Sequence, residues 1–318
     1  MNTKGTFVIS IDYEYGLGFA DHDLTLNEKA YIGKEVAITK RLLNTFDRYH
    51  IPATWAVVGH LLERACTWKG NISHPEYVRP VHRREQRDWF LHHPVQGTYD
   101  DAEWFDPHGL IDEIAKSPVK HEIASHSYAH IMYDEESTEE QNVFIDLKNM
   151  IHVHHEANLP VTSFIFPRNR EGRHALLKKV GVQCYRGAPK QWYEGFPGII
   201  KRGLHVFDYF LPFSRTVMAG SGEGGLVNIP GSMLLLGRGG LRKIIPVWLM
   251  KWKLKHGIQK SIDRGEIFHV WFHPSNFWHD TDVQFSILEN MLEEAVYLRK
   301  TNKLEIVTMQ QIASHLII

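Results

Sequence analysis

Apolar residues recur along this chain with two periods that alternate. Short runs rich in β-branched and aromatic residues, such as TFVISID at 6–12, favour strands, whereas KEVAITKRLLNTFDRYH at 34–50 carries apolar residues at helical spacing. The predicted strands lie at 6–12, 53–59, 121–125, 162–167, 183–187, 266–274 and 304–309, and the predicted helices lie at 34–50, 139–158, 174–181 and 282–301. Strands that alternate with helices predict a parallel sheet with crossover helices, either open or closed into a barrel.

Two segments interrupt this alternation. Residues 65–118 are rich in His, Pro, Trp and Asp and carry little periodicity, so we expect an insertion over one end of the sheet that sets substrate specificity. Residues 187–262 form a Gly/Pro-rich and basic excursion, whose GSGEGG formally matches a dinucleotide fingerprint. A strand-like run rather than a helix follows that motif, which indicates an ordinary turn. We predict one catalytic domain over 1–318 that carries both segments.

Composition excludes several classes of protein. With 43% hydrophobic and 23% charged residues the chain is typical of a soluble globular protein, and a net charge of −1 gives no attraction to nucleic acid. The two cysteines lack CxxC spacing, which excludes a disulfide framework and a thiolate cage. No apolar run approaches the ~18 residues of a membrane span. The chain enters a strand-like run at once without an apolar leader, so we expect a cytoplasmic protein.

One segment departs from this balanced charge. Residues 224–262 contain seven basic residues and no acidic one. Within them, IIPVWLMKWKLKH at 244–256 predicts a helix, on which Ile244, Ile245, Trp248, Leu249 and Trp252 form one apolar stripe. The pattern suits a barrel helix with solvated lysines. It also suits a peripheral membrane contact through 241–260, or a patch for a phosphate-bearing substrate.

The stretch HEIASHSYAH at 121–130 is the first sign of metal chemistry. A zinc-protease helix needs HExxH, and Ser125 stands where the second histidine would be, so that class of enzyme is excluded. His126 and His130 remain, and their i,i+4 spacing would place both imidazoles on one side of a helical turn. Two such histidines can share one metal ion, with bonds of roughly 2.0–2.1 Å if the ion is zinc.

Polar residues stand where several predicted strands end. Asp12 and Glu14 follow the first strand two residues apart, so their side chains share a face. The other strand-end groups are His126 with His130, PRNR at 167–170 and HPSNF at 273–277. Parallel α/β folds place ligand and catalytic groups at the carboxyl ends of strands, which predicts one shared site.

Taken together, these motifs resemble the polysaccharide deacetylase (NodB-homology) family, in its intracellular-type branch. SIDYE resembles the family's first acidic motif, IPATWAVVG its second strand, HEIASHSYAH its H-[ST]-x-x-x-H metal motif, FIFPRN its proline motif and VWFHP its late histidine motif. The likeness extends from residue 6 to about residue 310. It implies an α/β fold, a distorted (β/α) barrel of about seven parallel strands. It also implies a hydrolase that removes an N-acyl group, acetyl or formyl, from an amino sugar.

The resemblance also implies roles for individual residues. Glu14, His126 and His130 would bind one divalent metal ion, for which we expect zinc, although iron, cobalt, nickel and manganese also suit these ligands. Asp12 would be the general base for the attacking water, and His273 the general acid that protonates the leaving amine. The residues expected on the substrate and oxyanion side are Pro167, Arg168, Asn169 and Arg186.

Two departures from the family pattern leave questions open. Tyr13 separates the two acidic residues of the first motif, an arrangement similar to that of a branch that includes cyclic-amide and formamide hydrolases. The arginine that supports Asp12 could be Arg168, Arg170 or Arg186.

From these features we expect a metal-dependent deacylase of an N-acylated sugar, nucleotide-linked or lipid-linked, in surface-polysaccharide biosynthesis. The nearest alternative is an amidohydrolase acting on a cyclic imide or ureide. A non-catalytic sugar-binding barrel is the alternative from another class. We expect no nucleic-acid partner, and the 12% aromatic content leaves enough apolar surface for a homodimer.

Overall fold

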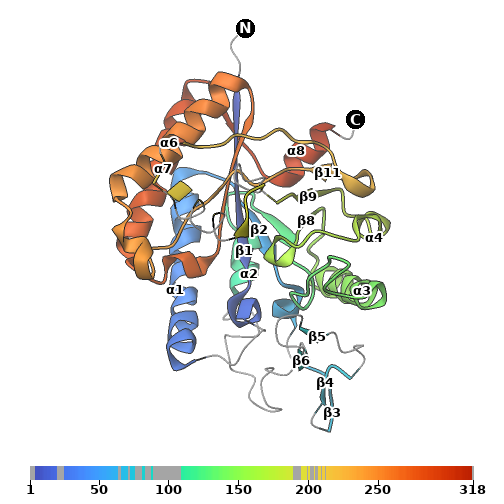
Figure 1. The fold of residues 1–318 in the computed structure, drawn as a ribbon. Helices are drawn as coiled ribbons and strands as arrows, with labels where there is room; N and C mark the ends of the chain where they lie inside the picture. Colours follow the sequence, from blue (N-terminus) through green and yellow to red (C-terminus); the bar gives the residue numbers. More distant parts are fainter. Residues whose placement is uncertain are drawn as a thin grey trace.

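A curved, mainly parallel sheet forms the centre of this computed structural model, and its strands run in the order β10-β11-β9-β8-β7-β2-β1-β13-β12 (Figure 1). The described residues are 4–19, 25–63, 66–70, 72–75, 81–82, 87–88, 109–188, 195–198, 200, 204, 207–208, 210–211 and 213–316. The strands of this sheet are β1 (Gly5–Tyr13), β2 (Thr54–Val57), β7 (Glu122–Ser125), β8 (Ser163–Ile165), β9 (Cys184–Arg186), β10 (Gly220–Ser221), β11 (Val227–Asn228), β12 (Met233–Leu234), β13 (Ile267–Phe272) and β14 (Leu304–Ile306), which also pairs with β1.

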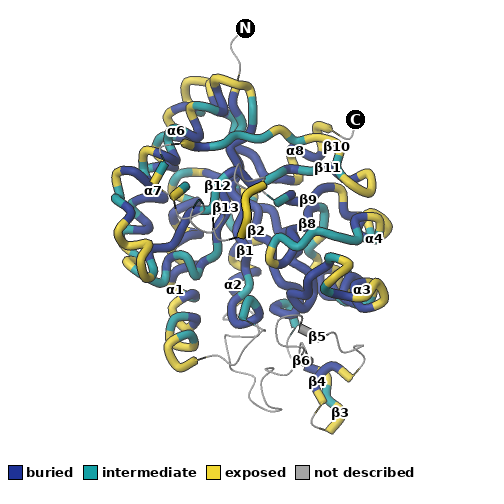
Figure 2. The backbone as a smooth tube through the Cα atoms, in the orientation of Figure 1, coloured by how far each residue is buried: buried dark blue, intermediate teal, exposed yellow. Residues whose placement is uncertain are grey.

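Helices cover the outer face of the sheet. They are α1 (Leu26–Tyr49), α2 (Leu110–Ala115), α3 (Glu140–Glu156), α4 (His174–Lys179), α6 (Val247–Arg264) and α7 (Thr281–Lys300). The last helix, α8 (Met309–Leu316), packs instead with inward-facing residues of the barrel strands. Figure 1 shows α1, α6 and α7 on one side of the sheet and α3 and α4 on the other. Their sheet-facing sides are buried and their outer sides exposed (Figure 2). The predicted alternation of strands and helices is therefore confirmed.

The segment from β11 to β12 bridges the two ends of the strand series. β11 pairs in parallel with β9, and β12 pairs in parallel with β13. Between them, the backbone N–H of Ser232 donates to the carbonyl of His269 at 2.8 Å. The sheet thus curls into the distorted (β/α) barrel that the sequence predicts.

Alternation along β1 separates the interior of the barrel from the core beneath the helices. Phe7, Ile9 and Ile11 pack outward with residues of α1, α6 and α7. Val8 packs on the opposite face, with one small or β-branched residue from each neighbouring strand and with apolar residues of α8. Ser10 and Asp12 share the face of Val8, because successive strand residues point to opposite sides. The inward residues nearest the carboxyl ends of the strands therefore face one another.

Two helices differ from their predicted form. α1 begins at Leu26, eight residues before the predicted start, because Thr25 and Glu28 form a capping box in which each side chain accepts from the other's backbone N–H. The predicted single stripe at 244–256 is wrong. Pro246 is the N-cap of α6, so Ile244 lies outside the helix, and its exposure is 67% while Leu249 on α6 is buried.

Two short hairpins lie at the carboxyl edge of the barrel strands (Figure 1). They are β3 (Trp68–Lys69) with β4 (Ile72–Ser73), and β5 (Val81–His82) with β6 (Arg87–Asp88). Both belong to the segment 65–118, most of which lies outside the described residues.

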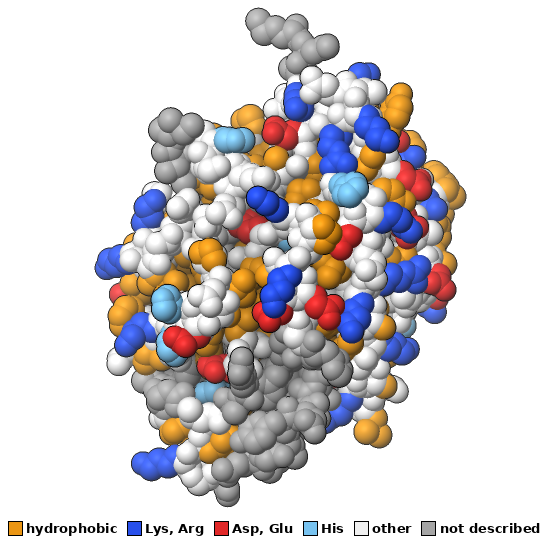
Figure 3. Space-filling view, turned by 180° about the vertical axis from the view of Figure 1, so that it is seen from behind, with side chains coloured by type: hydrophobic (Ala, Val, Ile, Leu, Met, Phe, Trp, Pro, Cys, Tyr) orange, Lys and Arg blue, Asp and Glu red, His pale blue; other side chains and the backbone are white. Residues whose placement is uncertain are grey.

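The face in Figure 3 intersperses Lys and Arg with Asp and Glu and carries no large field of one sign. Among the described residues, no helix combines the length and the apolar character needed to cross a membrane.

Candidate active site

The carboxylate of Glu14 stands at the centre of a cluster at the carboxyl edge of the barrel. Its Oε1 atom lies 2.9 Å from His126 Nε2, 3.3 Å from His130 Nε2 and 3.3 Å from His273 Nε2. Asp12 Oδ2 lies 3.6 Å from His273 Nε2. The structure therefore brings together all five residues that the sequence singled out, from the ends of β1, β7 and β13.

The segment that carries the two histidines of the HSYAH motif is an irregular loop. The predicted helical turn is wrong, because Ser127 and His130 adopt left-handed backbone angles with φ of 66° and 59°. The loop still brings the imidazole rings of His126 and His130 to 5.1 Å between centroids. The i,i+4 spacing thus predicted that the two rings lie close together, but not the backbone geometry that brings them there.

Asp146 on α3 holds this loop in place. Its carboxylate accepts the backbone N–H of Tyr128 at 2.9 Å, the backbone N–H of Ala129 at 3.0 Å and the hydroxyl of Tyr133 at 2.7 Å. Asp146 is fully buried, and these bonds replace the solvation that a buried carboxylate loses. The sequence analysis missed this residue, since an aspartate within a helix carries no signal of a contact 17 residues earlier.

The surroundings of the His126 and His130 rings suit a metal ion beside Glu14. His126 Nδ1 lies 2.8 Å from the carbonyl oxygen of Ile165, so this nitrogen carries the proton that it donates. In the neutral ring, Nε2 then turns a lone pair toward the Glu14 carboxylate, and a cation between them would remove that repulsion. His130 is buried, and neither of its ring nitrogens has a hydrogen-bond partner among the described residues, so Nε2, 3.3 Å from Glu14 Oε1, has a lone pair to offer a metal ion. Glu14, His126 and His130 therefore suit a divalent metal.

Arg186 at the end of β9 is the arginine that pairs with Asp12. Its Nη1 lies 2.6 Å from Asp12 Oδ1 and its Nη2 lies 2.7 Å from Asp12 Oδ2, a bidentate pair. The guanidinium is 1% exposed and lies over the ring of Trp271, 4.4 Å from its centroid. By contrast, Arg168 is exposed, and Arg170 pairs with Asp134 at 2.6 Å. The question left open by the sequence is thereby resolved.

A second layer beneath this pair was not foreseen from the sequence. Ser10 Oγ accepts from Arg186 Nη1 at 3.1 Å and lies 2.9 Å from His269 Nε2. Burial lowers the pKa of His269 to about 3, so the ring is neutral. Ser10 lies two residues before Asp12 and His269 lies four residues before His273, so all four side chains point to the inner face of the sheet. This even spacing is the sequence signal that could have identified Ser10 and His269.

The proline motif after β8 forms a tight turn, Pro167–Asn169. Arg168 and Asn169 both have left-handed backbone angles, with φ of 54° and 52°. The side-chain oxygen of Asn169 accepts from Arg186 Nη2 at 3.3 Å, which ties this turn to the Asp12 pair. Two successive non-glycine residues at positive φ are uncommon.

The charges in the cluster shift one another's pKa values. Burial raises the pKa of Asp12, but the charges of Arg186 and His273 outweigh it and keep that pKa below its ordinary value. Burial likewise opposes the effect of the carboxylates on His273, yet Glu14 and Asp12 raise its pKa to about 9. Near neutral pH the structure therefore pairs an ionised Asp12 with a protonated His273, a base beside an acid.

Comparison with known proteins identifies relatives of this chain. The family model described as "Polysaccharide deacetylase" matches residues 24–184. A comparison with curated proteins finds no match.

Solved structures share the fold at low sequence identity. A protein from Mycobacterium smegmatis assigned as a polysaccharide deacetylase is 16% identical, with a TM-score of 0.61, and the alignment covers 99% of this chain and 91% of that one. A second such protein, from Pseudomonas aeruginosa PAO1, is 12% identical, with a TM-score of 0.59 and coverage of 98% and 90%. Puue allantoinase is also 12% identical, with a TM-score of 0.60 and coverage of 98% and 89%.

Proposed function

The chain belongs to the polysaccharide deacetylase family, hydrolases that act on amide bonds, and from this premise we propose that it removes an N-acyl group from an amino sugar by metal-dependent hydrolysis. The observation that carries the proposal is the position of Glu14 Oε1, within 2.9–3.3 Å of three imidazole nitrogens. A divalent ion held by Glu14, His126 and His130 would polarise the acyl carbonyl and lower the pKa of a water molecule toward ~7.

The other residues of the site would move the protons. Asp12, whose two oxygens Arg186 orients, takes the proton of the attacking water as the new C–O bond forms. His273, with 27% of its side chain exposed, donates a proton to the amine nitrogen as the C–N bond breaks. The backbone of the Pro167–Asn169 turn, most directly at Arg168, would donate to the developing oxyanion. Removal of one such donor costs about 3 kcal/mol in other hydrolases.

Zinc is the metal we propose for this site, because two imidazoles and a carboxylate with open positions are a common catalytic zinc environment. The substrate we propose is a lipid-linked amino sugar in surface-polysaccharide biosynthesis, met at a membrane surface. Exposed apolar side chains of Leu241, Ile244, Trp248 and Trp252 support this proposal. Basic residues lie among them in the sequence, as in helices that bind anionic lipid surfaces. A nucleotide-linked substrate, a homodimer and a cytoplasmic location stay predictions.

The decisive experiment compares wild type with His126→Ala/His130→Ala. We expect the double variant to hold one zinc ion fewer per chain and to lose acetate or formate release from N-acylated amino sugars. Unchanged release by the double variant would contradict the mechanism. Cyclic imides and ureides belong in the same screen, because their exclusive hydrolysis would favour the related amidohydrolase. Wild type that binds zinc and sugar but hydrolyses nothing would favour a binding protein.

A further inference from the structure

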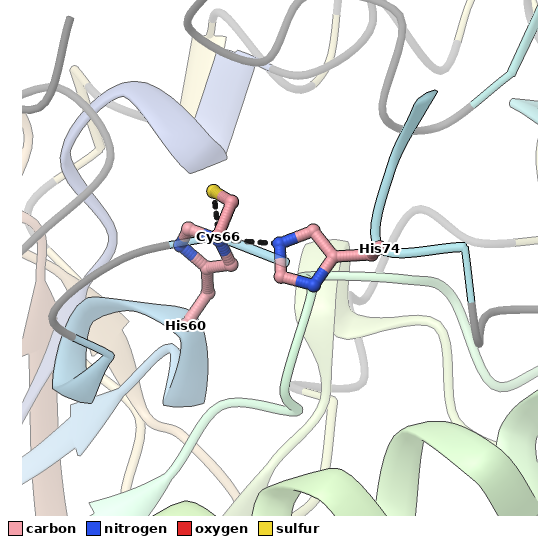
Figure 4. Close-up of side chains that lie close together, drawn as sticks. All are labelled: His60, Cys66 and His74. Carbon is pink, nitrogen blue, oxygen red and sulfur yellow. Dashed lines mark hydrogen bonds between the residues drawn. The ribbon is translucent and has the colours of Figure 1, made fainter. Parts of the chain in front are cut away.

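A second group of metal-ligating side chains lies outside the active site. His60 belongs to η2 (Gly59–Leu62), the short helix that follows β2, whereas Cys66 and His74 flank the β3–β4 hairpin. Figure 4 shows the three side chains turned toward a common point. His60 Nε2 lies 3.1 Å from His74 Nε2 and 3.5 Å from Cys66 Sγ. One ligand atom from each residue lies within 4.8 Å of the other two.

The two separations from His60 Nε2 fit two edges of a tetrahedral zinc site. Zinc bonds of about 2.05 Å to nitrogen and about 2.3 Å to sulfur, at tetrahedral angles, place two nitrogens ~3.3 Å apart and nitrogen and sulfur ~3.6 Å apart. His60, Cys66 and His74 are 0%, 6% and 2% exposed, which is the burial typical of a structural site. Two imidazoles with a thiolate select zinc over magnesium or calcium, since these harder ions prefer oxygen ligands.

The local backbone shows what such an ion would stabilise. β3 and β4 have two residues each, which is far too short for a hairpin that stands alone. The backbone N–H of His74 donates to the carbonyl of Thr67 at 2.8 Å. The two ends of the hairpin, which carry Cys66 and His74, therefore lie close together. A bond from each to an ion on His60 would fasten the hairpin to the barrel.

The same cluster lies against the loop of the active site. Gly59 and His60 donate their backbone N–H groups to the carbonyls of Ser127 and Tyr128, both at 2.8 Å. The ring of Tyr128 packs edge-on against His60 at 5.8 Å and His74 at 6.1 Å between centroids. Tyr128 is two residues from each of the histidines beside Glu14.

We propose that His60, Cys66 and His74 form a second zinc site, which fastens the β3–β4 hairpin against the loop of the active site. A fourth ligand, water or protein, would complete the tetrahedron. This site does not depend on the proposed hydrolysis, because none of its three ligands belongs to the cluster around Glu14.

Zinc analysis in the His126→Ala/His130→Ala background isolates this site from the first one. We expect that protein to keep one zinc ion per chain, and we expect either Cys66→Ala or His74→Ala to remove it. Cys184→Ala is the matched control, because Cys184 is also buried but bonds Ser163 Oγ inside the barrel. The proposal fails if the background protein holds no zinc after reconstitution, or if Cys66→Ala keeps the ion.

Cobalt substitution tests the same site without changing any of its ligands. Cobalt bound to Cys66 should give an intense thiolate-to-cobalt absorption band in the near ultraviolet, which the Glu14 site cannot produce because it has no sulfur ligand. We expect the band in wild type and in the His126→Ala/His130→Ala variant, with equal intensity per chain. A cobalt-loaded wild type without this band would overturn the proposal, even if the cysteine variants failed to fold.

Discussion

At the residue scale, the pairing of Asp12 with Arg186 keeps a buried carboxylate ionised, as its proposed role as a base requires. Asp12 is 3% exposed, and an isolated charge at that depth would be neutralised by protonation. The guanidinium bonds both carboxylate oxygens and orients them as a rigid unit. Ser10 and Asn169 accept further hydrogen bonds from the guanidinium, and the ring of Trp271 lies against its plane, which restricts the orientation of the arginine.

Arg186→Lys tests this role, because lysine keeps the charge but loses the planar fork. We expect kcat to fall about 10²-fold, the lower end of what a positioned general base contributes, while zinc content and KM change little. Steady-state kinetics with metal analysis is the measurement. Arg170→Lys is the matched control, since Arg170 pairs with Asp134 away from Asp12. An increase in KM with unchanged kcat would mean that Arg186 binds substrate instead.

At the element scale, the carboxyl ends of β1, β7 and β13 bring the site together, and α3 holds its least regular part. The loop after β7 has little regular structure of its own, so Asp146 supplies the bonds that define its path. The helix thus acts on the proposed metal ligands, His126 and His130, through backbone N–H groups rather than by direct contact.

Asp146→Asn should loosen this loop. An amide NH2 would then face backbone N–H donors, and two donors cannot bond each other. We expect zinc affinity at the Glu14 site to fall about 10–100-fold, as for other groups that orient metal ligands. Competition with a zinc chelator measures the change. Asp112→Asn on the exposed face of α2 is the control, and equal affinities in both variants would refute the role of Asp146.

The exposed apolar side chains around the start of α6 lead to a second prediction at this scale. Trp248→Ala/Trp252→Ala should weaken binding to vesicles that contain anionic lipid about tenfold or more, because each buried aromatic contributes roughly 1.5–3 kcal/mol. Co-sedimentation measures the bound fraction. Tyr297→Ala, which removes an exposed aromatic of α7, should change nothing. If wild type does not bind these vesicles at all, the membrane proposal is wrong.

At the scale of the whole molecule, buried neutral histidines link stability to pH. Burial lowers the pKa of His121 to about 4, that of His154 to about 4 and that of His269 to about 3. An unfolded chain protonates its histidines near pH 6.5. Between about pH 6.5 and pH 4 the unfolded state therefore binds more protons at these three histidines than the native state does, so their contribution lowers the free energy of unfolding as the pH falls.

His154→Leu should remove one of these contributions. Both ring nitrogens of His154 lack hydrogen-bond partners among the described residues, so leucine loses no such bond. We expect the free energy of unfolding to fall less steeply between pH 6.5 and pH 4, by about 1 kcal/mol per pH unit. Urea denaturation at several pH values measures the slope. The exposed neighbour His155→Leu should keep the wild-type slope, and equal slopes in the two variants would refute the assignment.

The sequence alone determined the alternation of the main strands and helices, because hydrophobic periodicity is a local property that every folded parallel α/β chain must satisfy. It also placed Asp12, Glu14, His126, His130 and His273 at one edge, since the carboxyl ends of parallel strands meet there. It did not predict the short elements α2, α8, β10 and β12. The sequence did not predict which side chains from distant parts of the chain contact one another. Only the tertiary structure decided that Arg186 pairs with Asp12, because three arginines were equally eligible and just one lies inside the barrel.

Tertiary contacts also decided the shape of the His126–His130 loop, for spacing in the sequence predicts a helical turn and cannot register the bonds from Asp146. His60, Cys66 and His74 match no metal motif by their spacing. They meet because η2 and the β3–β4 hairpin fold back against the same loop. A local sequence pattern predicts whether a segment is a strand or a helix. Which side chains contact one another depends on how these elements pack.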